Sequence, residues 1–339
     1  MTYKIVGKNV NPIGFGMMSL GLPREEPLSV EQKLELIKAA VDAGGNFLNG
    51  SEFYGEDLRD NSLSLLNLFF QKHPEYVDKV VIGIKGGMTV NPRATDNTPE
   101  YTRKSIENCL DLIGDKGKID MWEMARRATQ KEYIQSLRVI DEYVKLGKIG
   151  GVTLSEVNAK TIRQASKVVK VVGVEIELSL FYTNALHDGI VAACAELDIP
   201  IFAYSPLGRG FLAGKADKPE QLYKAFQGIP RFQKGNWEAN MRLVEAVRKW
   251  AAKKGCTPAQ FSINWLAALS KRPGMPRIIP IPGAGSMNRV KENIHVVDLT
   301  DEDMDEVDSF LKTFVPSGER LNEWLAQWSD TNDTEEVTA

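Results

Sequence analysis

The alternation of short apolar segments with helical patterns predicts an α/β fold, a (β/α)8 TIM barrel. Three observations support it: eight apolar segments, a helical pattern after each, and no internal repeat or linker in 339 residues. A doubly wound sheet is the alternative. It would place Gly-x-Gly-x-x-Gly directly after an early strand, and Gly14-x-Gly16 lacks the third glycine. The barrel therefore fits the pattern better.

The predicted strands are short and apolar, as parallel strands covered on both faces are. Before the first of them, Tyr3–Val10 predicts a β-hairpin with its turn at Gly7-Lys8. The eight barrel strands are expected at Ile13–Ser19, Asn46–Asn49, Val80–Lys85, Ile119–Met124, Gly150–Leu154, Val172–Ser179, Ile201–Ser205 and Ile278–Pro282.

The predicted helices show apolar residues at three- and four-residue spacing between recognisable ends. In the first helix, Leu34, Ile37 and Val41 share one face, and Gly44 ends the pattern. Thr98 precedes a proline and is expected to cap a later helix. The helices are expected at Val30–Ala43, Leu58–Gln71, Tyr101–Ile113, Lys131–Lys145, Ala159–Val169, Gly189–Leu197, Asn240–Lys254 and Ser286–His295.

Two segments break this regular spacing. Gly208–Glu238 follows the seventh strand and is rich in Gly, Lys, Phe and Pro, which is typical of a mobile loop over a site. Pro316–Trp328 carries two tryptophans and predicts a C-terminal tail that docks onto the barrel. We expect residues 1–328 to form a single domain and the acidic segment 329–339 to be disordered.

Composition and charge argue against several classes of function. The formal net charge is −3, whereas binding to nucleic acid needs a basic surface. No apolar run reaches the ~18 residues of a membrane span, and the N-terminus lacks a signal-peptide core, so a cytoplasmic protein is expected. The three cysteines and three histidines lack metal-ligand spacing, which disfavours a zinc site or a Ser-His-Asp hydrolase.

A polar loop after the second predicted strand is the strongest sign of a catalytic site. Asn46–Gly55 begins apolar, turns polar and presents Tyr54 between glycines. Lys85 ends the third strand, and its ammonium is expected at the same mouth; considered alone, an exposed lysine is the alternative. A cation near a phenol should lower the pKa of Tyr54 from ~10 toward neutrality. Tyr54 could then protonate a carbonyl oxygen while a hydride arrives at carbon.

Two glycine-containing segments suit phosphate groups. Tyr204–Gly210 ends the seventh strand, and its backbone amides suit a pyrophosphate. Gly283–Arg289 is a glycine-rich turn that opens a helix, and helix N-termini bind phosphate. A plain helix cap with a solvated arginine is the alternative for the second segment.

Four segments together resemble the aldo-keto reductase family over about residues 10–315. They are Asn49–Gly55, Lys85–Gly87, Tyr204–Gly210, and Ile279–Gly283 with Arg289–Asn293. The resemblance implies a (β/α)8 barrel, NADPH as cofactor, and a catalytic Asp-Tyr-Lys-His tetrad. In that tetrad, Tyr54 would be the proton donor and Lys85 the partner that sets its pKa.

The chain departs from this tetrad at two positions. Asn49 stands where the family has Asp, and Ala125 where it has His. This double departure is similar to the fungal pyridoxal reductase branch, which implies pyridoxal as the substrate. Asn49 can orient Lys85 by a hydrogen bond but cannot neutralise it. Ala125 leaves a wider mouth, which suits a bulky aromatic aldehyde.

Glu123 is the candidate for the missing negative charge. It lies two residues before Ala125, and therefore on the same inward face of the fourth strand, beside Lys85 on the adjacent strand. A carboxylate inside a barrel is costly unless it is paired. We therefore expect a Glu123–Lys85 ion pair. The alternative is that Glu123 bonds backbone or another basic residue.

The resemblance also implies which residues bind the cofactor. Ser155 and Glu175 would contact the nicotinamide carboxamide, and Arg289 would hold the 2′-phosphate, which favours NADPH over NADH. Glu292 and Asn293 would contact the adenine. The full set is Ser155, Glu175, Tyr204, Ser205, Leu207, Gly208, Arg209, Gly210, Gly283, Ser286, Arg289, Glu292 and Asn293.

Three functions remain open. The first is NADPH-dependent reduction of pyridoxal to pyridoxine, and the second is reduction of other aromatic or aliphatic aldehydes. The third is an NADPH-binding, redox-sensing interaction subunit with little turnover. Tyr54 and Lys85 favour the two enzymes, whereas the missing Asp and His keep the third function in view.

Overall fold

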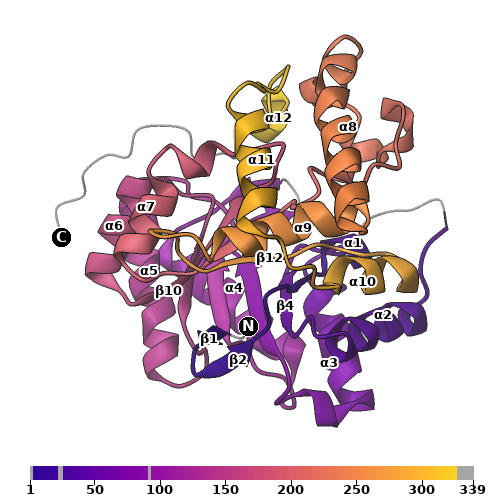
Figure 1. Cartoon of the computed structure of the whole chain (residues 1–339). Helices are drawn as coiled ribbons and strands as arrows, with labels where there is room; N and C mark the ends of the chain where they lie inside the picture. Colours follow the sequence, from indigo (N-terminus) through magenta and orange to yellow (C-terminus); the bar gives the residue numbers. More distant parts are fainter. Residues whose placement is uncertain (1–2, 22–25, 91–92, 327–339) are drawn as a thin grey trace.

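The computed structural model describes residues 3–21, 26–90 and 93–326, and eight parallel strands form its centre (Figure 1). Their order in the sheet is β12-β11-β10-β9-β8-β5-β4-β3. The strands are β3 (Phe15–Gly16), β4 (Phe47–Ser51), β5 (Val81–Gly86), β8 (Met121–Met124), β9 (Val152–Ser155), β10 (Val171–Glu177), β11 (Ile201–Tyr204) and β12 (Ile278–Pro280).

The two outermost strands of this order meet, which closes the barrel. The Gly14 amide donates to the Pro280 carbonyl at 2.9 Å, and the Gly16 amide donates to the Pro282 carbonyl at 3.0 Å. Glycine is needed at position 16, because a Cβ there would lie 2.7 Å from the Ile281 carbonyl oxygen. The predicted (β/α)8 barrel is confirmed.

An apolar plug fills the N-terminal end of the barrel. The hairpin strands β1 (Tyr3–Ile5) and β2 (Lys8–Val10) pair antiparallel around Val6-Gly7, so the turn lies one residue earlier than predicted. Their buried residues pack against buried apolar residues of the barrel strands. This plug consists of Tyr3, Ile5, Val10, Phe47, Val81, Met121, Phe202, Ile279 and Ile281. Polar chemistry is therefore confined to the opposite, C-terminal end of the strands.

Helices surround the barrel, with α5, α6 and α7 on one side and α2 and α3 on the other (Figure 1). The predicted helix α3 begins four residues late because Asn61 caps it, its Oδ1 accepting from the Leu63 amide at 2.8 Å. The ring consists of α2 (Val30–Asp42), α3 (Ser62–Lys72), α4 (Pro99–Ile113), α5 (Gln130–Lys145), α6 (Ala159–Val168), α7 (Ile190–Glu196), α9 (Pro258–Leu269) and α10 (Met287–Ile294).

The helix that packs against β12 is not the predicted one. The predicted helix, α8 (Asn236–Lys254), packs against α9 and projects beyond the barrel (Figure 1). The unpredicted α9 takes the position beside β12. Its start carries a capping box, in which Thr257 and Gln260 each bond the other's backbone amide. The Thr-Pro-x-Gln pattern is the sequence signal that could have predicted the start of α9.

The remaining elements decorate the ring. A short helix, α1 (Met18–Gly21), follows β3, and a small hairpin, β6 (Met88–Val90) and β7 (Arg93–Thr95), follows β5. Helices α11 (Asp301–Leu311) and α12 (Glu323–Ala326) end the described chain. In the described residues, no helix is both long and apolar enough to cross a membrane.

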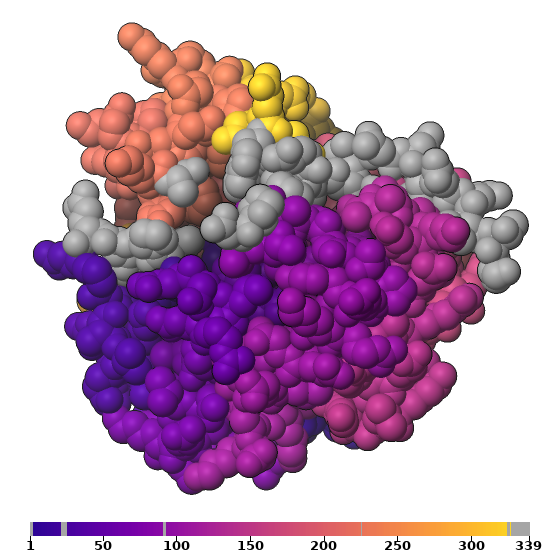
Figure 2. Space-filling view, turned by 180° about the vertical axis from the view of Figure 1, so that it is seen from behind, coloured from indigo at the N-terminus to yellow at the C-terminus, as the bar shows by residue number. Residues whose placement is uncertain are grey.

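The long loop and the tail pack together beside α8. The loop after β11 forms a series of 3₁₀ turns around stacked aromatic rings, with Phe181 and Phe211 centroids 4.8 Å apart. The Ser317 amide donates to Asn240 of α8 at 2.8 Å, and Arg320 pairs with Glu156 beyond β9 at 3.0 Å, so the predicted docking of the tail is confirmed. Figure 2 shows this orange and yellow part standing above the indigo-to-magenta body. Trp328 and residues 329–339 lie outside the described residues.

Candidate active site

Lys85 lies at the centre of a buried polar network at the C-terminal mouth of the barrel. Its Nζ donates to Asn49 Oδ1 at 2.7 Å and to the two Glu175 oxygens at 2.9 and 3.0 Å. Asn49 Nδ2 donates to Glu175 Oε2 at 2.6 Å. Burial alone would lower the pKa of Lys85, but the charge of Glu175 outweighs it, and the pKa lies above its usual value. Lys85 is therefore held as an ammonium ion.

The anion that pairs with Lys85 is Glu175, so the predicted Glu123–Lys85 pair is wrong. Glu175 extends from β10 across the barrel to Lys85 on β5, two strands that are not neighbours. Both of its oxygens accept from Lys85, and Oε2 also accepts from Asn49, while the predicted carboxamide contact of Glu175 stays a prediction. The narrow barrel interior brings side chains of non-neighbouring strands within hydrogen-bonding distance, whereas the prediction considered only the adjacent strand.

Glu123 is buried beside this pair as a neutral acid. It is the register neighbour of Lys85, yet these two residues, both described by the structure, are not within 4.0 Å as an ion pair. Burial, together with the negative charge of Glu175, raises the pKa of Glu123 well above its usual value. Its Oε2 has no hydrogen-bond partner among the described residues. Glu123 thus retains its proton at the mouth.

Tyr54 lies on the loop after β4, with its ring over Lys85. The Lys85 Nζ is 5.2 Å from the ring centroid. Burial raises the pKa of Tyr54, and Glu175 raises it further, whereas Lys85 and Arg126 lower it; the balance is upward. The predicted shift toward neutrality is therefore wrong, because burial of the phenol, aided by the charge of Glu175, outweighs the effect of Lys85 on the pKa of Tyr54. Tyr54 is a neutral phenol at physiological pH, with a proton to donate.

Glu52 lies within the Asn46–Gly55 loop, and no role was predicted for it. Its side chain is buried, accepts from the Gly87 amide at 3.1 Å and from Asn108 Nδ2 at 3.4 Å, and also bonds Ser105. Glu52 therefore fastens the Tyr54 loop to the end of β5 and to α4. Burial raises its pKa to about 7. The only signal in the sequence was the position of this charged residue within a motif of otherwise small and aromatic residues.

A second charged cluster lies at the ends of β9 and β10. Arg320 Nη2 lies 3.0 Å from Glu156 and its Nη1 lies 3.4 Å from Glu177, while Arg209 Nη2 lies 3.4 Å from Glu177. Burial alone would raise the pKa of Glu156, but the charges of Arg320 and Arg126 outweigh it and lower the pKa to about 2. This cluster ties the tail and the long loop to the barrel.

Several predicted cofactor residues gather at the same mouth. Ser155 ends β9 next to Glu175, is fully buried, and its Oγ has no partner among the residues that the structure describes. Tyr204 ends β11, and burial raises its pKa well above the usual value. The turn after it includes Ser205, Leu207, Gly208, Arg209 and Gly210, four of which adopt positive φ. An unsatisfied hydroxyl beside an amide-rich turn fits a nicotinamide nucleotide, and the binding roles stay predictions.

The start of α10 presents the predicted phosphate residues to solvent. Ser286 is the N-cap and accepts from the Arg289 amide at 3.4 Å, and both side chains are exposed. Asn293 instead donates to the Gly283 carbonyl at 3.1 Å, and Glu292 pairs with Lys215 at 2.9 Å. The last two residues therefore have structural partners, and their predicted adenine contacts are untested.

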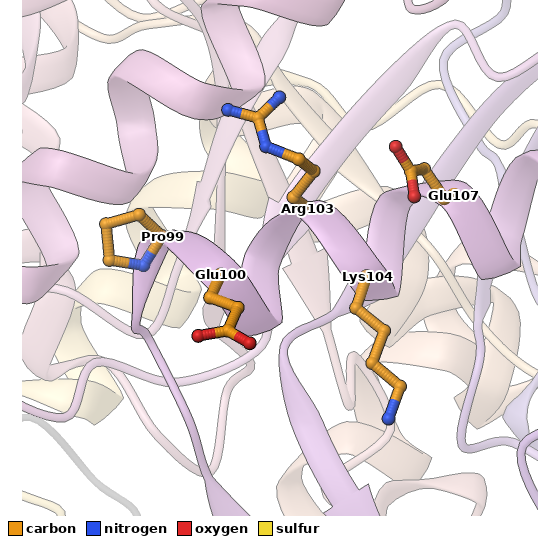
Figure 3. A pocket seen from close by; sticks show the side chains of 5 residues that line it. All are labelled: Pro99, Glu100, Arg103, Lys104 and Glu107. Carbon is orange, nitrogen blue, oxygen red and sulfur yellow. The ribbon is translucent and has the colours of Figure 1, made fainter.

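A surface hollow on the outer face of α4 is separate from the mouth. It encloses about 340 Å³ and is lined by Pro99, Glu100, Arg103, Lys104 and Glu107 (Figure 3). Arg103 pairs with Glu142 at 2.8 Å on this exposed face. Nothing buried and reactive opens into it. Within the described part of the chain, no three His, Cys, Asp or Glu residues are placed to hold a metal ion.

Comparisons with known proteins agree with this geometry. Residues 12–312 match the aldo/keto reductase family. The chain is 34% identical over 328 residues to a probable pyridoxal reductase 2 of Schizosaccharomyces pombe, covering 94% of this chain and 97% of that protein. It is 35% identical over 336 residues to a putative pyridoxal reductase of Saccharomyces cerevisiae, covering 91% and 94%.

Solved structures agree with the fold. A glycerol dehydrogenase from Gluconobacter oxydans superposes with a TM-score of 0.79 at 22% identity, covering 94% of this chain and 97% of that one. Likeness at this identity supports the barrel alone, whereas the family match and the two relatives cover nearly the whole chain. The chain belongs to the aldo/keto reductase family.

Proposed function

We propose that this aldo/keto reductase reduces the aldehyde of pyridoxal to the alcohol of pyridoxine with NADPH. The observation that carries the proposal is Tyr54, a neutral phenol held over the Lys85 ammonium at the barrel mouth. The names of two relatives that align over nearly the whole chain favour pyridoxal as the substrate. NADPH would supply the hydride, with Ser155 and the Tyr204–Gly210 turn holding it and Ser286 and Arg289 at its 2′-phosphate.

Tyr54 would supply the proton. The substrate carbonyl oxygen accepts a hydrogen bond from the phenol, and the proton transfers as negative charge develops on that oxygen. The phenolate left on Tyr54 is stabilised by the Lys85 ammonium 5.2 Å from its ring centre. Because the pKa of Tyr54 is raised, the phenol is the prevailing form at neutral pH. That form serves reduction, whereas alcohol oxidation would need the phenolate as a base.

Ala125 sets the size of the substrate site. It follows β8, its amide donates to the Gly86 carbonyl at 2.9 Å, and it is buried. A methyl group at this position takes up less of the site than an imidazole would, which would favour a bulky aldehyde over a small aliphatic one.

The test is steady-state consumption of NADPH with pyridoxal. Tyr54→Phe should lower kcat by about 10²–10⁴-fold, the usual contribution of a general acid. The matched control is Tyr143→Phe on α5, a buried tyrosine away from the mouth whose hydroxyl bonds Glu107 of α4 at 2.7 Å, and this variant should retain turnover. Equal turnover in Tyr54→Phe and wild type would refute the acid role. Tight NADPH binding without consumption would favour the redox-sensing subunit, and a higher kcat/KM for simple aldehydes would favour the general reductase.

A further inference from the structure

Arg126 occupies the space above Ala125, where the proposed mechanism uses no residue. It directly follows Ala125 at the end of β8 and is half-buried. Its Nη1 donates to the Ala125 carbonyl at 2.6 Å, so the guanidinium folds back over the alanine. Asn97 donates to its carbonyl at 3.1 Å, which fixes the backbone at this point. A planar cation is thus held over the mouth of the barrel.

Arg126 follows β8, the strand that pairs with β5, on which Lys85 lies. Its charge lowers the pKa of Tyr54 and the pKa of Tyr204, against the larger effect of burial on both groups. Glu156 and Glu175 also act on it, and they raise its own pKa against the effect of burial. Arg126 is therefore charged and lies at the end of the barrel that carries Tyr54 and Lys85.

Arg126 differs from the other arginines at this end of the barrel. Arg209 and Arg320 each pair with a carboxylate at 3.0–3.4 Å. Within the described residues, no carboxylate lies within 4.0 Å of Arg126, and its side-chain hydrogen bond to the Ala125 carbonyl uses one of five N–H donors. A half-buried guanidinium that has unused donors and no carboxylate in direct contact among the described residues can bind an anionic oxygen.

We propose that Arg126 selects aromatic aldehydes that carry an ionised hydroxyl group ortho to the aldehyde. In such a substrate, the two oxygens lie side by side in the ring plane. The aldehyde oxygen would accept from Tyr54 and the adjacent phenolate oxygen from Arg126, so one ring would be held by two donors from the strand ends on either side of β5. This inference rests on the proposed reductase function and specifies its substrate class. The alternative is that Arg126 binds a phosphate group on another part of the substrate.

Positional isomers test this inference. Salicylaldehyde carries the hydroxyl ortho, 3-hydroxybenzaldehyde carries it meta, and benzaldehyde lacks it. In Arg126→Met, kcat/KM for salicylaldehyde and pyridoxal should fall about 10- to 100-fold, mainly through KM, since a charge-assisted hydrogen bond is lost. Values for benzaldehyde and 3-hydroxybenzaldehyde should stay within about threefold of wild type. Arg126→Lys should restore part of the preference, and Arg127→Met, the adjacent arginine, should leave it unchanged.

The outcomes separate this inference from the proposed function. An equal loss for all four aldehydes would overturn the ortho-selective role of Arg126 while the reductase stands. A loss confined to phosphorylated pyridoxal would assign Arg126 to the phosphate instead. If wild type consumes no NADPH with any aldehyde, the proposed function fails. In that case, the preference can still be measured by binding. The affinities of wild type and Arg126→Met for salicylaldehyde and benzaldehyde are measured by tryptophan fluorescence. Equal affinities of wild type for the two aldehydes would overturn the role of Arg126.

Discussion

The inner cluster (Asn49, Lys85, Glu123 and Glu175) sets two carboxyl groups against one ammonium, whereas the outer cluster (Glu156, Glu177, Arg209 and Arg320) sets two against two guanidinium groups. Both clusters are buried at the same end of the barrel. Their acids nevertheless differ: the pKa of Glu123 lies well above its usual value, and that of Glu156 falls to about 2. The number of cations decides which buried carboxyl group keeps its proton.

Glu52 extends the comparison to a carboxyl group without a cation. Its partners are the Gly87 amide, Ser105 and Asn108, which are neutral donors. Burial raises its pKa to about 7, because hydrogen bonds offset only part of the desolvation. The number of neighbouring cations thus rises across the three sites. Glu52 has none, Glu123 shares one with Glu175, and the outer cluster has two.

The two clusters also differ in what they join. The inner cluster is built from β4, β5, β8 and β10, so its geometry is fixed by the barrel itself. The outer cluster joins Glu156 and Glu177 at strand ends to Arg209 on the long loop and Arg320 on the tail. The inner cluster therefore sets the chemistry of Tyr54, and the outer cluster holds the late segments in place.

The largest expected effect comes from removing the anion of the inner cluster. Glu175→Gln should lower the free energy of unfolding by about 3 kcal/mol, because it leaves the buried Lys85 ammonium without its ion-pair partner. Glu123→Gln should change it by less than about 1 kcal/mol, because Glu123 is already neutral. Urea unfolding at neutral pH measures both.

These two variants test whether Glu123, rather than Glu175, carries the proton. If Glu123→Gln costs as much as Glu175→Gln, the proton does not reside on Glu123. The double variant sharpens the result: once Glu175 is replaced, Glu123 can ionise to compensate Lys85, so the second substitution should cost more in Glu175→Gln than in wild type.

An intermediate effect is expected in the outer cluster. Arg320→Met should lower the free energy of unfolding by about 2 kcal/mol at neutral pH, because about 1.4 kcal/mol accompanies each pKa unit. The pKa of Glu156 is lowered on folding, so its contribution is present above about 4.5 and is lost as the pH falls toward 2. The difference from wild type should therefore shrink below about pH 4 in urea titrations.

Arg103→Met is the control for that prediction, since Arg103 and Glu142 form an exposed pair that should contribute less than about 0.5 kcal/mol. A cost for Arg320→Met that is no greater than for Arg103→Met would show that the outer cluster does not stabilise the tail. A cost that stays constant as the pH falls would separate the effect from Glu156.

The smallest effect concerns Glu52. Its pKa is raised on folding, so the folded state holds a proton that the unfolded state releases, and stability falls as the pH rises from about 4.5 through about 7. Between about pH 6 and pH 7, wild type should lose about 1 kcal/mol more than Glu52→Gln. Parallel pH profiles of thermal unfolding for the two proteins would contradict the assignment.

The barrel and most of its ring followed from local pattern. Alternating apolar segments and caps such as Thr98 are properties of neighbouring residues, so strands and helices could be predicted in order. The helix beside β12 could not be assigned this way, because α8 and α9 are both regular helices. Which of the two lies against the strand depends on packing, and the structure places α9 there.

The site divides in the same way. The sequence by itself determined that Tyr54, Lys85, Asn49 and Glu123 come to one end of a barrel, since strand order and two-residue alternation fix each position. Only the tertiary structure decided that Lys85 pairs with Glu175 rather than Glu123, and that Tyr54 keeps its proton. The physical reason is distance across a closed barrel: opposite strands share one narrow interior, and the charges that meet there set each other's protonation.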